Sequence, residues 1–187
     1  INNLYGWNGD INYTYQIARG TASDPEQARA SITGGKLPEI HLIPLNWDQT
    51  HTLSLAMMYS QKIWGGSLIA QLGSGLPYTP ESTDDISTLI VNSSRKPITW
   101  NVDFRSYYQV NIFGESLTVF FRVKNLFDHL NHNNVYNDSG RANETVQITR
   151  ALKTNPSEAI NSISDWFNNE TFYSQPRRVE LGINYDF

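Results

Sequence analysis

A strict two-residue alternation recurs in six stretches of this chain and limits what it can fold into. The last stretch is "VELGINYDF", residues 179–187, where odd positions are apolar or aromatic and even positions are small, polar or charged. Successive side chains of a β-strand point to opposite faces, so each stretch predicts a strand with one apolar face. The other five stretches are residues 11–17, 53–59, 68–72, 100–112 and 117–123.

The apolar face of these six predicted strands carries no charge. Its one polar member is Ser106, whereas the charged residues occupy intervening positions: Asp103, Arg105, Arg122, Glu180 and Asp186. Such strands fit a soluble β-sandwich with a dry interior. They also fit a transmembrane barrel whose strands alternate between lipid and lumen. Taken alone, the alternation favours the sandwich.

The connections between these strands reverse that preference. They are alternately long and short, at residues 18–52, 60–67, 73–99, 113–116 and 124–178. In an up-and-down antiparallel sheet, every long connection then lies at one rim and every tight turn at the other, as in outer-membrane barrels. We expect Gly65, Gly66 and Gly114 to supply positive φ in the tight turns. The sequence therefore predicts an all-β, antiparallel up-and-down transmembrane β-barrel, with long extracellular loops and short periplasmic turns.

Aromatic residues gather near both predicted rims, as expected where rings meet lipid headgroups. Near the tight turns they are Tyr59, Trp64, Phe113, Tyr185 and Phe187, and near the long loops Trp47, Tyr78, Trp100, Phe127 and Tyr173.

Composition narrows the classes further. Charged residues make up 17% of the chain, against about 25% in soluble domains. There is no cysteine, which excludes disulfides and thiolate metal sites. A net charge of −4 with no basic run argues against a nucleic-acid partner. No apolar stretch approaches the roughly 18 residues of a transmembrane helix.

Six strands leave two open edges. Within lipid, each unpaired backbone N–H or C=O costs several kcal/mol, so spanning sheets must close. Known single-chain barrels start at about eight strands. The opening "INNLYGWNGD" also looks like mid-domain sequence. We therefore expect residues 1–187 to be the C-terminal part of an outer-membrane barrel domain, with its N-terminal strands elsewhere in a longer protein, and we expect them not to fold alone.

Five motifs, in order along the chain, resemble the C-terminal barrel of TonB-dependent outer-membrane receptors. They are "PLNWDQTHTLSL" (44–55), "GSGLPYTP" (73–80), "FFRVKNLFD" (120–128), "VYNDSGRA" (135–142) and "YSQPRRVELGINYDF" (173–187). The resemblance implies a barrel of about 22 strands around a plug domain. It also implies a bacterial outer-membrane location and TonB-driven uptake of a scarce solute: a siderophore, cobalamin, glycan or peptide.

The resemblance further implies a set of partners. They are the rest of the barrel and its plug, outer-membrane lipid, the small solute, the TonB complex acting through the N-terminal part, and the barrel-assembly machinery. That machinery would read an assembly signal formed by Val179, Leu181, Ile183, Tyr185 and Phe187.

The sequence contains few candidates for chemistry. Asp128, His129, His132 and Asp138 could be interpreted as a metal site, but their spacing matches no zinc pattern, so an exposed polar loop is favoured. His51, at the loop-end rim, is expected in hydrogen bonds. No Ser/His/Asp arrangement indicates nucleophilic catalysis. The sequence therefore predicts neither an enzyme nor a bound cofactor.

Two groups of residues are candidates for contact with a solute. Asp103, Arg105 and Arg122 fall on the predicted lumen face of neighbouring strands, where a structural cross-strand charge ladder is favoured over substrate contact. Trp166 lies in a predicted helix that Asn155 and Pro156 would begin, and it is the candidate loop contact to a ligand.

Three other functions remain open at this stage. One is a passive porin or structural barrel, which an upstream plug domain would distinguish. A second is a soluble carbohydrate-binding β-sandwich, suggested by the many Tyr, Trp and Asn residues. A third is a barrel lipase, which needs a Ser/His pair on the apolar face, where we expect Ser106 but no strand histidine.

Overall fold

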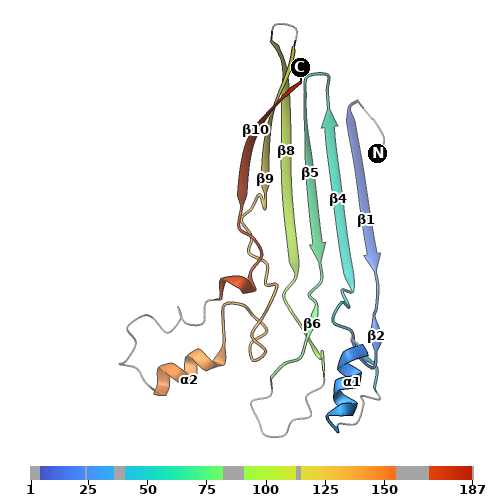
Figure 1. Ribbon diagram of the computed structural model, residues 1–187, viewed down its shortest axis with the longest axis vertical. Coiled ribbons are helices and arrows are strands. Elements are labelled where there is room, and N and C mark those ends of the chain that lie inside the picture. Colours follow the sequence, from blue (N-terminus) through green and yellow to red (C-terminus); the bar gives the residue numbers. More distant parts are fainter. Residues whose placement is uncertain are drawn as a thin grey trace.

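The computed structural model describes residues 5–23, 25–35, 41–81, 91–112, 115–154 and 169–186. Its centre is a six-stranded antiparallel sheet in which each strand pairs with its neighbours in chain order (Figure 1). The strands are β1 (Trp7–Tyr15), β4 (His51–Ser60), β5 (Trp64–Gly73), β8 (Thr99–Ile112), β9 (Glu115–Lys124) and β10 (Arg178–Asp186). All six strands predicted from the alternation are confirmed, and the chain is β-rich.

Three long connections link these strands: the first covers residues 16–50, the second 74–98 and the third 125–177. They contain two small sheets, β2 (Arg19–Gly20) with β3 (Ile43–Pro44) and β6 (Pro77–Tyr78) with β7 (Ser94–Arg95). They also contain α1 (Pro25–Thr33), α2 (Val146–Thr154) and the 3-10 turn η1 (Glu170–Phe172). All these elements lie at one end of the sheet in Figure 1, so the predicted separation of long and short connections is confirmed.

The pairing register places all six apolar stretches on one face of the sheet. Residues directly opposite each other in an antiparallel pair share a face. One row across the sheet contains Ile11, Leu55, Ala70 and Val102, and another contains Tyr108, Val119 and Ile183. We call this the apolar face and the opposite one, with Asn101 and Arg105, the polar face.

The apolar face is uncovered within the described chain. Large side chains such as Ile11, Leu181 and Ile183 are exposed, Leu181 by 74%. The buried hydrophobic residues of the described chain are few: Ile43, Val123, Val135 and Ala142. A sheet normally buries its apolar face against a second layer. Here no second layer from the described part of the chain covers that face.

Two glycines on the polar face make room for aromatic rings. These two are Gly65 and Gly182. Gly65 and its neighbour Gly66 lack the positive φ expected of turn glycines, because both belong to strand β5. A Cβ on Gly65 would lie 2.7 Å from the Tyr107 ring opposite it, and a Cβ on Gly182 would overlap the ring of Phe120. Each glycine therefore lets a cross-strand ring lie over its strand. Gly114 lies outside the described residues.

Candidate functional site

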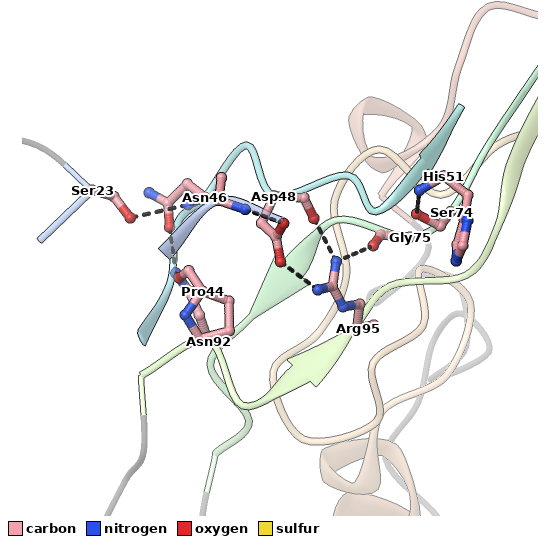
Figure 2. A network of polar contacts seen from close by, with 10 residues as sticks. Ser23, Pro44, Asn46, Asp48, His51, Ser74, Gly75, Asn92 and Arg95 are labelled. Atoms are coloured by element: carbon pink, nitrogen blue, oxygen red, sulfur yellow. Dashed lines mark hydrogen bonds and ion pairs between the residues drawn. The ribbon is translucent and has the colours of Figure 1, made fainter. Parts of the chain in front are cut away.

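A buried carboxylate joins the first and second long connections. Asp48, 1% exposed, accepts a hydrogen bond from the Ala18 amide at Oδ1 (2.8 Å) and lies 2.5 Å from Arg95 Nη2 at Oδ2. Arg95 also donates to the carbonyls of Asp48 and Gly75 (Figure 2). A buried charge requires such partners, so this ion pair holds the two connections together.

The pKa of Asp48 reflects these contacts. Burial alone would raise the pKa of this carboxyl. Hydrogen bonds from the Ala18 amide and from Arg95, with the charges of Arg95 and Arg19, outweigh burial and hold the pKa below its usual value. The stabilisation that comes with a lowered carboxyl pKa is fully present when the pH is above the unfolded-state pKa of about 3.9. That stability is lost as the pH falls through the lower folded-state value, so the ion pair is complete at neutral pH.

Asn92 makes a second link between the same two connections. Its Nδ2 donates to the Pro44 carbonyl and to Asn46 Oδ1, both at 2.8 Å (Figure 2). Its amide donates to Thr79 Oγ1 at 3.0 Å, and the Asn46 amide donates to Ser23 Oγ at 3.0 Å. Asn92 has a φ of 58°, a left-handed conformation that asparagine tolerates better than most residues.

Two buried asparagines hold the third long connection in place, Asn131 against the sheet and Asn125 within the connection itself. The carboxamide of Asn131 accepts from the Trp100 amide and donates to the Trp100 carbonyl, both at 2.8 Å, in the manner of a paired strand residue. Asn125, with a φ of 53°, donates from Nδ2 to the carbonyls of His129 (2.9 Å) and Gln175 (3.0 Å). These bonds explain why "KNLFDHLN" has asparagine at both positions.

The second and third connections are also linked. Lys96 Nζ donates to the Asn133 carbonyl at 2.6 Å, and burial lowers the pKa of this lysine. The Tyr78 ring lies against Gly140, whose φ of 70° and lack of a side chain both suit glycine. The three long connections therefore form one connected unit, which we call the loop layer.

The residues considered for a metal site do not converge. Each takes its own partner: Asp128 the Arg177 amide, His129 the Trp100 ring, His132 the Ala142 amide, and Asp138 the Val146 amide at the start of α2. Throughout the described ranges, no three potential metal ligands come together. Of the four, Asp128 is exposed, whereas His129, His132 and Asp138 are partly buried, so the exposed-loop interpretation fits Asp128 alone.

Protonation of His132 is expected to weaken the third connection. Burial, with the charges of Arg141 and His129, lowers the pKa of His132, and its Nδ1 accepts the Ala142 amide at 3.1 Å. Because the pKa of this histidine is lower in the folded state than the unfolded-state value of about 6.5, the folded protein loses stability as the pH falls below that value. Hydrogen exchange at Ala142, corrected for intrinsic rate, should speed up as the pH drops from about 8 to about 5. Constant protection over that range would contradict this assignment.

The three candidate charged residues lie on the polar face of β8 and β9. Arg122 lies 3.0 Å from Glu180 on β10, which also pairs with Arg178 at 2.8 Å. Arg105 and Arg122 face each other directly, and such like-charged pairs are destabilising. The centroid of the Phe120 ring lies 5.7 Å from the guanidinium carbon of Arg105 and 5.8 Å from that of Arg122. The π-face of this ring attracts both cations.

Asp103 does not join that charge ladder. Its Oδ1 accepts from Asn101 Nδ2 at 2.7 Å and from the Asn125 amide at 2.9 Å. Arg105 has no acidic partner within ion-pair distance among the described side chains. The ladder therefore contains Arg122 but neither of the other two candidates.

The expectation that the strands contain no histidine was wrong. His51 is the first residue of β4 and lies on the apolar face, where its Nδ1 hydrogen-bonds the Tyr13 hydroxyl at 2.8 Å. Ser106 shares that face, in the row of Tyr59. Eight residue steps along β4, from His51 to Tyr59, separate the two rows by about 26 Å, so the pair that a lipase needs is not assembled.

Several candidate residues lie outside the described part of the chain: Trp166, the helix expected after Asn155, and Phe187. The other four residues of the expected assembly signal, Val179, Leu181, Ile183 and Tyr185, lie exposed on the apolar face of β10. The sequence did not point to the buried residues Asp48, Asn92 and Asn131, or to Arg95, the exposed partner of Asp48.

The fold and these contacts define an amphipathic up-and-down β-sheet with a loop layer at one end. No family model matches the chain, and neither does any curated protein or solved structure. No helix in the described ranges is long and apolar enough to cross a membrane.

Proposed function

We propose that this chain is the C-terminal wall of an outer-membrane β-barrel that takes up a scarce solute by TonB-dependent transport. The observation that carries the proposal is the continuous, uncovered apolar face. Large side chains such as Leu181 and Ile183 are stable there if they meet hydrocarbon, and they are a liability in water.

Aromatic clusters at both ends of the apolar face support a bilayer environment. Trp7, Tyr59 and Trp64 pack together near the tight turns, with ring centroids 4.8 and 4.9 Å apart. Trp100 and Phe127 pack at 5.8 Å near the loop layer. Outer-membrane barrels have aromatic girdles at both interfaces, with the apolar band between them.

Barrel closure is the second part of the proposal. In the described sheet, β1 and β10 are the edge strands, each with one neighbour. Their outer N–H and C=O groups need partners in lipid, and additional strands of a closed barrel would supply them. In a barrel of the family the sequence resembles, the polar face would line a lumen that holds the plug.

The transport role depends on the five family-like motifs and not on a catalytic group. In this transport role, Arg105 is the best-placed lumen cation for contact with the plug or a solute. The assembly signal consists of Val179, Leu181, Ile183, Tyr185 and Phe187. A passive porin would share the wall but lack the plug and the requirement for TonB. A soluble carbohydrate-binding protein would have to cover the apolar face with protein.

Site-directed spin labelling of the full-length protein in lipid vesicles tests the membrane location. Labels at Val102, Phe121 and Ile183 should collide with dissolved oxygen, and labels at Ser67 and Asn184 with a water-soluble relaxing agent. Water exposure at the first three sites would overturn the barrel.

A separate measurement tests transport. Solute uptake by cells carrying the full-length protein should stop when TonB is deleted or the inner membrane is de-energised. Uptake that continues at the same rate would favour the passive porin.

A further inference from the structure

A hollow lies on the polar face, directly next to the loop layer. Its volume is about 340 Å³, within the range of about 300–1,000 Å³ typical of small-molecule sites. The ends of β4, β5 and β8 form its floor, Gln49 of the first connection borders it, and Asn131 of the third connection borders it as well. The hollow is therefore built by both the sheet and the loop layer.

Two neighbouring rows of the polar face at this end contain no charged residue. One row consists of Thr14, Thr52, Gly73 and Thr99, and the next of Asn12, Ser54, Gln71 and Asn101. Apart from Gly73, every side chain in these rows is a hydroxyl or an amide. Gly73 leaves space for the side chain of Gln49, because a Cβ at position 73 would overlap the Gln49 amide. That amide donates to the Ser74 carbonyl at 3.0 Å.

Several of these polar groups have no partner. Within the described chain, the hydroxyls of Thr52, Ser54 and Thr99 and the amide of Gln71 make no hydrogen bond, although all four line the hollow. Asn131 differs, since its carboxamide is occupied by the Trp100 backbone. The hollow thus offers free donors and acceptors on a floor fixed by strand pairing.

The chemistry of this lining selects a class of ligand. An anion would require an unpaired arginine or lysine, and a cation would require a free carboxylate. No carboxylate is among the residues that line the hollow, and the neighbouring Asp103 accepts hydrogen bonds from Asn101 and the Asn125 amide at Oδ1. Leu53, Leu72 and Trp100 also border the hollow, but the strand register places their side chains on the apolar face, so an apolar ligand would meet the hydroxyls and amides. Hydroxyls and amides both donate and accept hydrogen bonds, as the hydroxyls of a sugar do.

We propose that this hollow binds a neutral, polyhydroxylated solute, an oligosaccharide, through Thr52, Ser54, Gln71 and Thr99. The inference rests on the proposed function, because it assigns the polar face to the lumen through which the solute passes. It narrows the proposed solute from four classes (siderophore, cobalamin, glycan and peptide) to the glycans.

Binding of neutral oligosaccharides to the full-length protein in detergent tests the inference. The probes are immobilised oligosaccharides of glucose, mannose, galactose and xylose, each compared with its uronic acid form. At least one neutral probe should bind. Gln71→Leu should weaken that binding about tenfold, as should Thr52→Val combined with Thr99→Val, because each variant removes hydrogen bonds and little volume.

Thr118→Val is the matched control. Thr118 lies on the same polar face, opposite Gln109 and Asn184, well away from the hollow. It should leave binding unchanged. The inference is overturned if no neutral probe binds, if uronic acids bind more tightly, or if Thr118→Val weakens binding as much as Gln71→Leu does. A plug segment covering these residues, shown by a cross-link from Gln71→Cys that no probe displaces, would also overturn it.

The two proposals fail in distinguishable ways. If spin labels show lipid at the apolar face but no sugar binds, only the solute class is wrong. If the protein is water-soluble and still binds sugar through Gln71, the membrane role is wrong and a carbohydrate-binding protein remains.

Discussion

Replacing Leu68 by lysine is expected to destabilise the folded protein in lipid vesicles by about 2–4 kcal/mol. Leu68 lies in the middle of β5, on the apolar face, between Met57 of β4 and Phe104 of β8. If that face meets hydrocarbon, the ammonium group has no water or counter-charge within reach. Reversible urea unfolding of the full-length protein, monitored by tryptophan fluorescence, gives the free-energy change.

The adjacent residue supplies the control. Ile69 has the same side-chain composition as Leu68 but lies on the polar face, opposite Ala56 and Asp103. Ile69→Lys places its charge near the Asp103 carboxylate on the face proposed to line an aqueous lumen, so stability should change by no more than about 0.5 kcal/mol. Equal costs at the two positions would show that both faces have the same surroundings, which no barrel in lipid allows.

Replacing Arg95 by methionine is expected to open the loop layer at a local cost on the order of 3–5 kcal/mol. The variant leaves the carboxylate of Asp48, whose side chain is 2% exposed, without its counter-charge. Asp48→Asn should cost less, because Arg95 is 39% exposed and regains water when the carboxylate is neutralised. Hydrogen exchange at the Ala18 amide, which donates to Asp48, reports the local opening free energy.

Arg29→Met is the matched control for that experiment. Arg29 lies in the same first connection and pairs with Glu26 at 4.0 Å, but both side chains are more than three-quarters exposed. Surface pairs of this kind contribute about 0–1 kcal/mol. A loss of Ala18 protection as large in Arg29→Met as in Arg95→Met would mean that the first connection opens without regard to the buried pair.

The sheet could be predicted from sequence because its physics is local in the chain. Alternation defines each strand and its faces, and connection length defines which strands can be neighbours. Even the short stretch around Leu68 and Leu72 was recognised as a strand by this rule. The same pattern restricts the register, since a slip of one residue would mix the two faces.

The loop layer could not be predicted in the same way. Asp48 and Arg95 are far apart in the sequence, and no periodic pattern marks Asp48 as buried or pairs it with Arg95. The positive φ of Asn125 and Asp128 is likewise a property of a fold that bends "KNLFD" into a turn. The glycines misled for a related reason: Gly65 looks like a turn residue until the Tyr107 ring above it is seen.

The consecutive strand order has a consequence for how this sheet is made. No strand has to slip between two others that are already joined, so the sheet can grow by adding one strand at a time to an open edge. The pairs β4 with β5 and β8 with β9 are joined by the shortest chain segments, and short loops lose the least entropy on closing. We therefore expect these two hairpins to form first. The long connections are expected to become ordered after the hairpins that they link have paired.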